Sequence, residues 1–175
     1  MVLLIVDTQK LIMDKHLYNF EALESNIKLM ISTARENGME VVYVRHYDHP
    51  GCGGLSKDKE GFQIYDEFKP QADERIFDKD VNSAFKNSGL LEYLNEKGEK
   101  QIIIAGLQTD YCIDATIKCG FEHGFEIFVP ENSNSTFSNK FMTGEQSYKY
   151  YNEFIWDNRY AKCISMNEAL ELIKK

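Results

Sequence analysis

Short apolar runs alternate with amphipathic segments along the whole chain. Several runs are apolar without a break, which is typical of strands buried on both faces of a parallel sheet. Apolar residues that recur every three or four positions predict helices between these runs. The predicted strands cover residues 2–6, 41–46, 74–79, 101–106, 125–130 and 160–165. The predicted helices cover residues 21–37, 62–68, 88–97 and 110–122, and two more begin at the capping boxes of Thr143 with Gln146 and of Ser165 with Glu168.

This order of elements predicts the fold. Strands that alternate with helices form βαβ units, whose strands run parallel and whose helices cover both faces of the sheet. We therefore predict a three-layer α/β/α fold with a Rossmann-like, mainly parallel sheet of six strands. The 175 residues suit one domain with a full core, and neither a repeat nor a linker divides residues 1–175.

Composition and charge narrow the class of protein. With 28 acidic and 20 basic residues the formal net charge is −8, which argues against binding to nucleic acid or to an anionic membrane. The apolar run after Met1 is too short for a secretion signal, and no uncharged run reaches the ~18–20 residues of a membrane span. We therefore expect a cytoplasmic protein with no nucleic-acid or membrane partner, while the net charge leaves a small-molecule substrate open because a local pocket can oppose the overall sign. Its cysteines, Cys52, Cys112, Cys119 and Cys163, are far apart and are expected to be reduced thiols.

Three reactive side chains follow predicted strands. Ligands of such sheets bind at the carboxyl ends of the strands, and this edge is where Asp7, Lys79 and Cys112 are expected. Cys112 also begins a predicted helix, whose free amide groups and dipole favour the thiolate and could hold an oxyanion. Gly106 suits the tight exit from the preceding strand.

Each of the three also has a structural interpretation. Cys112 could be a small core residue, as we expect for Cys119 and Cys163. Asp7 could cap a turn, although a buried carboxylate can also exchange a proton with a thiol and a leaving amine. Lys79 could be a surface lysine, but in the same crevice its charge would stabilise both thiolate and carboxylate.

Four segments surround or follow these residues: LLIVDTQ from residue 3, KDVNSAF from residue 79, GLQTDYCIDAT from residue 106 and FEIFVPENSNST from residue 125. In their order and spacing, these segments resemble the isochorismatase-like cysteine hydrolase superfamily. The resemblance implies a catalytic triad of Asp7, Lys79 and Cys112. It also implies a cis peptide bond between Leu107 and Gln108, and an oxyanion hole made by the Gln108 and Cys112 amides.

The resemblance implies a reaction as well. Asp7 would take the proton of Cys112, the thiolate would attack a carbonyl, and Asp7 would return the proton to the departing amine. Water would then release the acid from the thioester. We therefore predict a hydrolase of carbon–nitrogen bonds other than peptide bonds, in amides or lactams. Isochorismate hydrolysis and a non-catalytic Rossmann-like binding protein are the alternatives.

Finer features point to a branch of the superfamily. The segment QTDYCIDAT (108–116) is most similar to the streptothricin-hydrolase-like branch. Nicotinamidases bind a metal through an Asp-x-His pair, whereas Asp48 and His49 are adjacent here. We therefore expect no cofactor, with a metal site of His46, Asp48 and His49 as the alternative.

Further contacts are expected around the site and on the surface. The expected substrate contacts are Gln9, His46, Phe85, Tyr111 and the ENSNST run (131–136). Aromatic residues are enriched at protein interfaces, so the tyrosine-rich segment 146–156 could join copies of the chain in a homo-oligomer, a dimer or tetramer; it could equally well be a helix that packs on the core.

Overall fold

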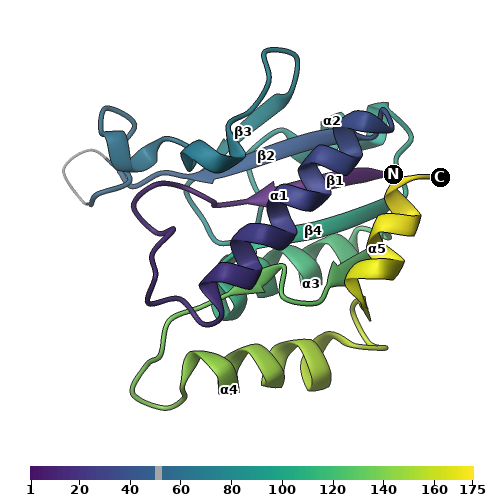
Figure 1. The fold of residues 1–175 in the computed structure, drawn as a ribbon. Helices are drawn as coiled ribbons and strands as arrows, with labels where there is room; N and C mark the ends of the chain where they lie inside the picture. The colour runs from purple at the N-terminus through teal and green to yellow at the C-terminus, as the bar shows by residue number, and fades with distance from the viewer. Residues whose placement is uncertain (50–52) are drawn as a thin grey trace.

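One parallel sheet organises the chain (Figure 1). The computed structural model describes residues 1–49 and 53–175; the predicted thiol Cys52 lies outside the described residues. The strand order is β3-β2-β1-β4-β5-β7, and β6 pairs with the end of β4. The strands are β1 Val2–Val6, β2 Glu40–His46, β3 Arg75–Lys79, β4 Gln101–Leu107, β5 Glu126–Pro130, β6 Asn134–Ser135 and β7 Lys162–Ile164. All six predicted strands are present, and β6 is an additional strand of two residues.

The helices also follow the predicted pattern, with local differences. They are α1 Phe20–Glu36, α2 Leu90–Glu96, α3 Asp114–Glu122, α4 Gly144–Lys149 and α5 Met166–Ile173. Two 3₁₀ turns, Glu60–Phe62 and Asp66–Phe68, replace the single short helix predicted over residues 62–68. A π-helical turn, Thr109–Ile113, precedes α3, and another, Tyr150–Trp156, continues α4. Both predicted capping boxes form, at the first residues of α4 and α5.

The sheet is buried between two layers of helices, as predicted. Successive strand residues point to opposite faces, so that Leu3 and Ile5 belong to one core and Leu4 and Val6 to the other. Helices α1 and α5 cover the first face, and α2 and α3 cover the second (Figure 1). Burial on both faces explains why β1 is apolar at every position.

The close approach of β4 to β1 depends on Gly106. This residue has φ of 131°, and a Cβ atom there would lie 1.9 Å from the carbonyl oxygen of Val6. Its amide donates to Ser133 O at 2.9 Å, and Gly106 and Leu107 are paired with β6. The glycine therefore lets β4 lie between β1 and β6 just before the loop that leads to Cys112.

Among the described residues, no helix is both long enough and apolar enough to cross a bilayer.

We predict that Gly106→Ala is strongly destabilising. The new methyl group would overlap the Val6 carbonyl, so we expect a loss of at least about 3 kcal/mol in the free energy of unfolding. Urea denaturation of the purified variant measures this loss.

Gly98→Ala is the matched control. Gly98 also has a positive φ, 69°, but a Cβ atom there meets nothing within 4 Å, so its expected cost is about 1 kcal/mol. Equal costs for the two substitutions would contradict the proposed role of the Val6 contact.

Candidate active site

Four side chains from four neighbouring strand ends meet at the carboxyl edge of the sheet. Asp7 follows β1, His46 ends β2 and Lys79 ends β3, while Cys112 lies in the π-helical turn after β4. His46 and Lys79 are register partners across β2 and β3. The sheet order β3-β2-β1-β4 therefore places His46 between the backbone of Lys79 and that of Asp7.

The Lys79 ammonium is the common partner of this cluster. Its Nζ donates to Asp7 Oδ2 at 2.6 Å and to Cys112 Sγ at 3.3 Å, and lies 3.4 Å from His46 Nδ1. The side chains of Lys79 and Asp7 are 0% and 2% exposed. An ammonium has three N–H donors, so one acceptor is available for each of them. The structure thus brings the three residues of the predicted triad into direct contact.

Asp7 keeps one carboxylate oxygen free. Its Oδ1 is buried and has no hydrogen-bond partner among the described residues. A carboxylate oxygen of Asp7, a ring nitrogen of His46 and Cys112 Sγ all lie within 4.8 Å of one another. The backbone of Asp7 has φ of 53°, a conformation that non-glycine residues adopt at a cost and that is frequent at functional sites. Asp7 is therefore placed to exchange a proton with the thiol.

The thiol of Cys112 is held in its neutral form. Burial raises the pKa of Cys112 to about 12, the charge of Asp7 acts in the same direction, and the Lys79 ammonium opposes both. The predicted depression of the thiol pKa by a helix start is therefore wrong for this site. Burial also raises the pKa of Cys163 to about 12, and Cys119 packs against the same core.

The loop before Cys112 has the geometry that the resemblance implies. The peptide bond between Leu107 and Gln108 is cis, and no described residue accepts a backbone hydrogen bond from the Gln108 amide. The Gln108 carbonyl accepts from the amides of Tyr111 and Ile113, both at 3.1 Å. These bonds fix the turn that carries Cys112 relative to Gln108.

Polar residues of the ENSNST run form hydrogen bonds with residues of this loop. Thr109 Oγ1 donates to Asn134 Oδ1 at 2.7 Å, and Thr136 Oγ1 donates to Asp110 Oδ1 at 2.5 Å. Residues 133–136 are buried, with exposures of 0–2%. The prediction that this run forms a pocket wall is therefore corrected: it positions the loop that carries the site.

A cavity of about 280 Å³ opens over the cluster. Two of the predicted substrate contacts, His46 and Tyr111, line it, and Tyr111 is 53% exposed. The full lining is Asp7, Ile12, His46, Leu55, Asn82, Gln108, Tyr111 and Cys112. Asn82 belongs to the segment KDVNSAF, so its position after Lys79 was a usable signal. Ile12 and Leu55 lie in irregular segments, and no pattern in the sequence marked them as residues of the site.

Two predicted substrate contacts lie elsewhere. Phe85 is in the core, stacked on Phe125 with ring centroids 5.6 Å apart, because the chain turns inward after Asn82. Gln9 is fully buried beneath the site. Its amide accepts from His46 N at 2.9 Å and donates to His46 O at 2.8 Å, so it fixes the backbone of His46.

The residues of the alternative metal site have separate partners. Asp48 Oδ2 accepts from the Leu55 amide at 3.0 Å, and His49 Nε2 lies 3.8 Å from Asp80 Oδ2. His46 instead lies with Asp7 and Cys112, a set of ligand types that zinc accepts. The Lys79 ammonium already contacts all three, so a metal ion in this place would have to displace it.

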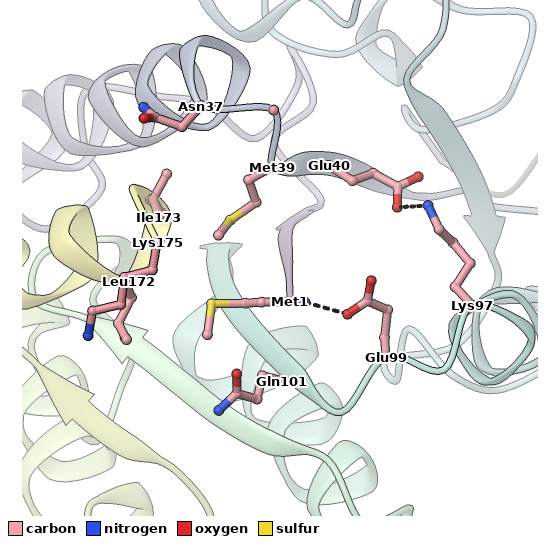
Figure 2. Close-up of a pocket in the computed structure, with 11 residues that line it drawn as sticks. Met1, Asn37, Met39, Glu40, Lys97, Glu99, Gln101, Leu172, Ile173 and Lys175 are labelled. Atoms are coloured by element: carbon pink, nitrogen blue, oxygen red, sulfur yellow. Dashed lines mark hydrogen bonds and ion pairs between the residues drawn. The ribbon is translucent and has the colours of Figure 1, made fainter.

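A larger cavity, of about 680 Å³, lies at the opposite edge of the sheet (Figure 2). The amino end of β1 and the segments before β2 and β4 line it. Two ion pairs lie in its lining, the Met1 ammonium with Glu99 and Lys97 with Glu40, and Lys175 adds a further cation. Its described lining contains no cysteine, serine or threonine, unlike the lining of the cavity over Cys112.

Comparison with known proteins gives a consistent result. The isochorismatase domain family matches residues 1–155 of the chain. An uncharacterized isochorismatase family protein of Bacillus subtilis, YrdC, is 30% identical over 151 residues, which are 85% of this chain and 79% of the relative. The ureidoacrylate amidohydrolase RutB of Yersinia enterocolitica is 24% identical, over 83% and 77% of the two chains. The streptothricin hydrolase of Streptomyces noursei is 22% identical, over 62% and 42%.

Solved structures agree with the fold. An isochorismatase family protein superposes with a TM-score of 0.86 at 25% identity, over 94% of this chain and 97% of that one. A cysteine hydrolase from Pseudomonas syringae superposes with a TM-score of 0.91 at 18% identity, over 99% and 92%. The three-layer architecture is thus shared along nearly the whole chain.

We predict that Asp7→Asn makes Cys112 more reactive towards iodoacetamide. The substitution removes a negative charge that raises the thiol pKa and leaves the opposing charge of Lys79 in place. Each unit by which the pKa falls gives about tenfold more thiolate at pH 8. Mass spectrometry of peptides from timed reactions measures the rate at Cys112, with Cys119 in the same molecule as the control. Slower labelling of Cys112 in the variant would show that Asp7 already acts as its base in the resting protein.

Proposed function

The chain belongs to the isochorismatase family, and from this premise we propose that it is a cysteine hydrolase that cleaves the C–N bond of a small amide through a thioester on Cys112. The observation that carries the proposal is the shared contact of the buried Lys79 ammonium with Asp7 and Cys112, which both line one cavity. The amidohydrolase among the relatives supports the same reaction class.

The first half of the proposed reaction forms the thioester. When an amide carbonyl reaches Sγ, the proton of Cys112 passes to the free Oδ1 of Asp7, and the thiolate attacks the carbonyl carbon. The amides of Gln108 and Cys112 hold the oxyanion. Asp7 then donates its proton to the nitrogen, the C–N bond breaks, and the amine leaves.

The second half releases the acid. Asp7, again a carboxylate, takes a proton from a water molecule that attacks the thioester carbonyl. The C–S bond breaks, the sulfur recovers the proton, and the carboxylic acid departs. Lys79 stays protonated throughout and acts as the counter-ion, so it does not enter the proton exchange.

Isochorismate hydrolysis is the alternative, since it gives the family its name. That reaction cleaves a vinyl ether and needs no thioester. An acyl adduct on Cys112 therefore distinguishes the two reactions.

We predict that Cys112→Ala lowers amide hydrolysis by at least about 10³-fold, because it removes the nucleophile. Ammonia release from a panel of small amides measures turnover, and intact-mass analysis after rapid quenching detects the acyl adduct on the parent protein.

Cys119→Ala is the matched control, since Cys119 lies two turns further along α3 in the core, and it should retain activity. Activity that survives in Cys112→Ala, or cleavage of isochorismate with no amide hydrolysed, would refute the proposal.

A further inference from the structure

The cavity over Cys112 combines apolar walls with uncharged polar groups. Ile12 and Leu55 are its apolar side chains, and Asn82, Gln108 and Tyr111 supply amide and hydroxyl groups. Asp7 is the one carboxylate of the described lining, and its charge is opposed by Lys79 at 2.6 Å. The charge of a bound substrate would therefore have to be matched by a group outside this lining.

His46 is a poor source of such a charge. Its Nδ1 lies 3.4 Å from Lys79 Nζ, next to the ammonium of the cluster. A second positive charge on this ring would be repelled by that ammonium, so His46 is not a favourable counter-ion for a bound anion.

The cations nearest in sequence to the lining residues His46, Leu55 and Ile12 are engaged in ion pairs. Arg45 and Lys57 both pair with Asp78, at 2.9 and 2.8 Å. Lys10 pairs with Glu60 and Asp66. The sequence of residues 50–52, Pro-Gly-Cys, adds no cation. A carboxylate brought into the cavity would therefore lose water without gaining a counter-ion, which is strongly unfavourable.

We propose that this site acts on uncharged acyl groups and rejects amides whose acyl part carries a carboxylate or an ammonium. The inference rests on the proposed function, because it assigns a substrate class to the same cavity. An uncharged acyl group can use the apolar walls and the polar groups of Asn82, Gln108 and Tyr111. An ammonium is rejected for the same reason as a carboxylate, since the Asp7 charge is already matched by Lys79.

The first experiment uses two alkylating reagents that differ in charge. Iodoacetamide is neutral and iodoacetate is anionic, and both label a thiol in one step with loss of iodide. The ratio of their rates at Cys112, divided by the ratio at Cys119 in the same protein, reports the charge preference of the cavity. We expect the neutral reagent to be favoured at Cys112 by at least about tenfold after this correction. A corrected ratio near one, or a preference for iodoacetate, would overturn the inference.

The second experiment uses three amides with the same two-methylene spacer between the carbonyl and the terminal group. Butyramide ends in a methyl group, succinamate in a carboxylate and β-alaninamide in an ammonium. We expect kcat/KM for butyramide to exceed the values for both charged amides by at least about tenfold. Faster turnover of either charged amide would overturn the inference and leave the proposed function standing.

A charge variant tests the cause of the preference. Ile12 lines the cavity and is partly exposed, so Ile12→Lys adds a cation there, and Ile12→Met is the uncharged control of similar length. We expect Ile12→Lys to raise the relative rate of iodoacetate at Cys112 about tenfold, and Ile12→Met to leave it unchanged. The same shift in both variants would show that shape, and not charge, sets the preference.

The two experiments separate the two proposals. The labelling ratio needs only an accessible thiol, so it tests the cavity even if no amide is turned over. A neutral preference in labelling, together with no hydrolysis and no acyl adduct from any amide, would refute the proposed function while the inference about the cavity stands.

Discussion

The buried ammonium of Lys79 is the interaction on which the site depends. A charged group that is fully removed from water is stable only if its donors are matched, and removing one member of such a buried pair costs about 3–5 kcal/mol. Lys79 meets this condition with Asp7, Cys112 and His46. Neighbouring strands are about 4.8 Å apart, so a side chain at the end of β3 must cross β2 to reach Asp7 after β1. The length of a lysine side chain allows this, and the sheet order brings the three acceptors to its tip.

Hydrogen bonds of Gln9 and the pairing of β6 with β4 fix the backbone on the two sides of this cluster. Gln9 bonds both the amide and the carbonyl of His46, so the end of β2 is held against the segment after β1. On the other side, β6 pairs with the last residues of β4, and Gly106 lets that strand pass close to Val6. The reacting groups therefore lie on strand ends and on one short turn, which keeps their separations small and constant.

Much of this arrangement could be predicted from the sequence, because it depends on periodicity and order along the chain. Uninterrupted apolar runs located the strands, and the rule that ligands bind at carboxyl ends selected Asp7, Lys79 and Cys112. The roles of Gln9 and Phe85 could not be predicted, because the direction of a loop side chain depends on its packing against segments that are distant in the sequence. The direction of the Cys112 pKa shift was missed for a related reason. The local effect of a helix start favours the thiolate, whereas burial of the thiol is a tertiary effect that raises its pKa to about 12.

The neutral state of the Cys112 thiol and the proposed preference of the cavity for uncharged substrates have the same physical origin. In the resting site the ammonium of Lys79 balances one negative charge, that of Asp7, while the thiol of Cys112 is neutral. During the proposed reaction this one charge moves from Asp7 to sulfur and then to the carbonyl oxygen, so the total charge of the site stays the same at each step. An uncharged amide preserves that balance, whereas a charged acyl group would add a charge with no counter-ion in a place largely removed from water. The same dry surroundings that keep Cys112 protonated before the substrate arrives therefore also select which substrates can enter.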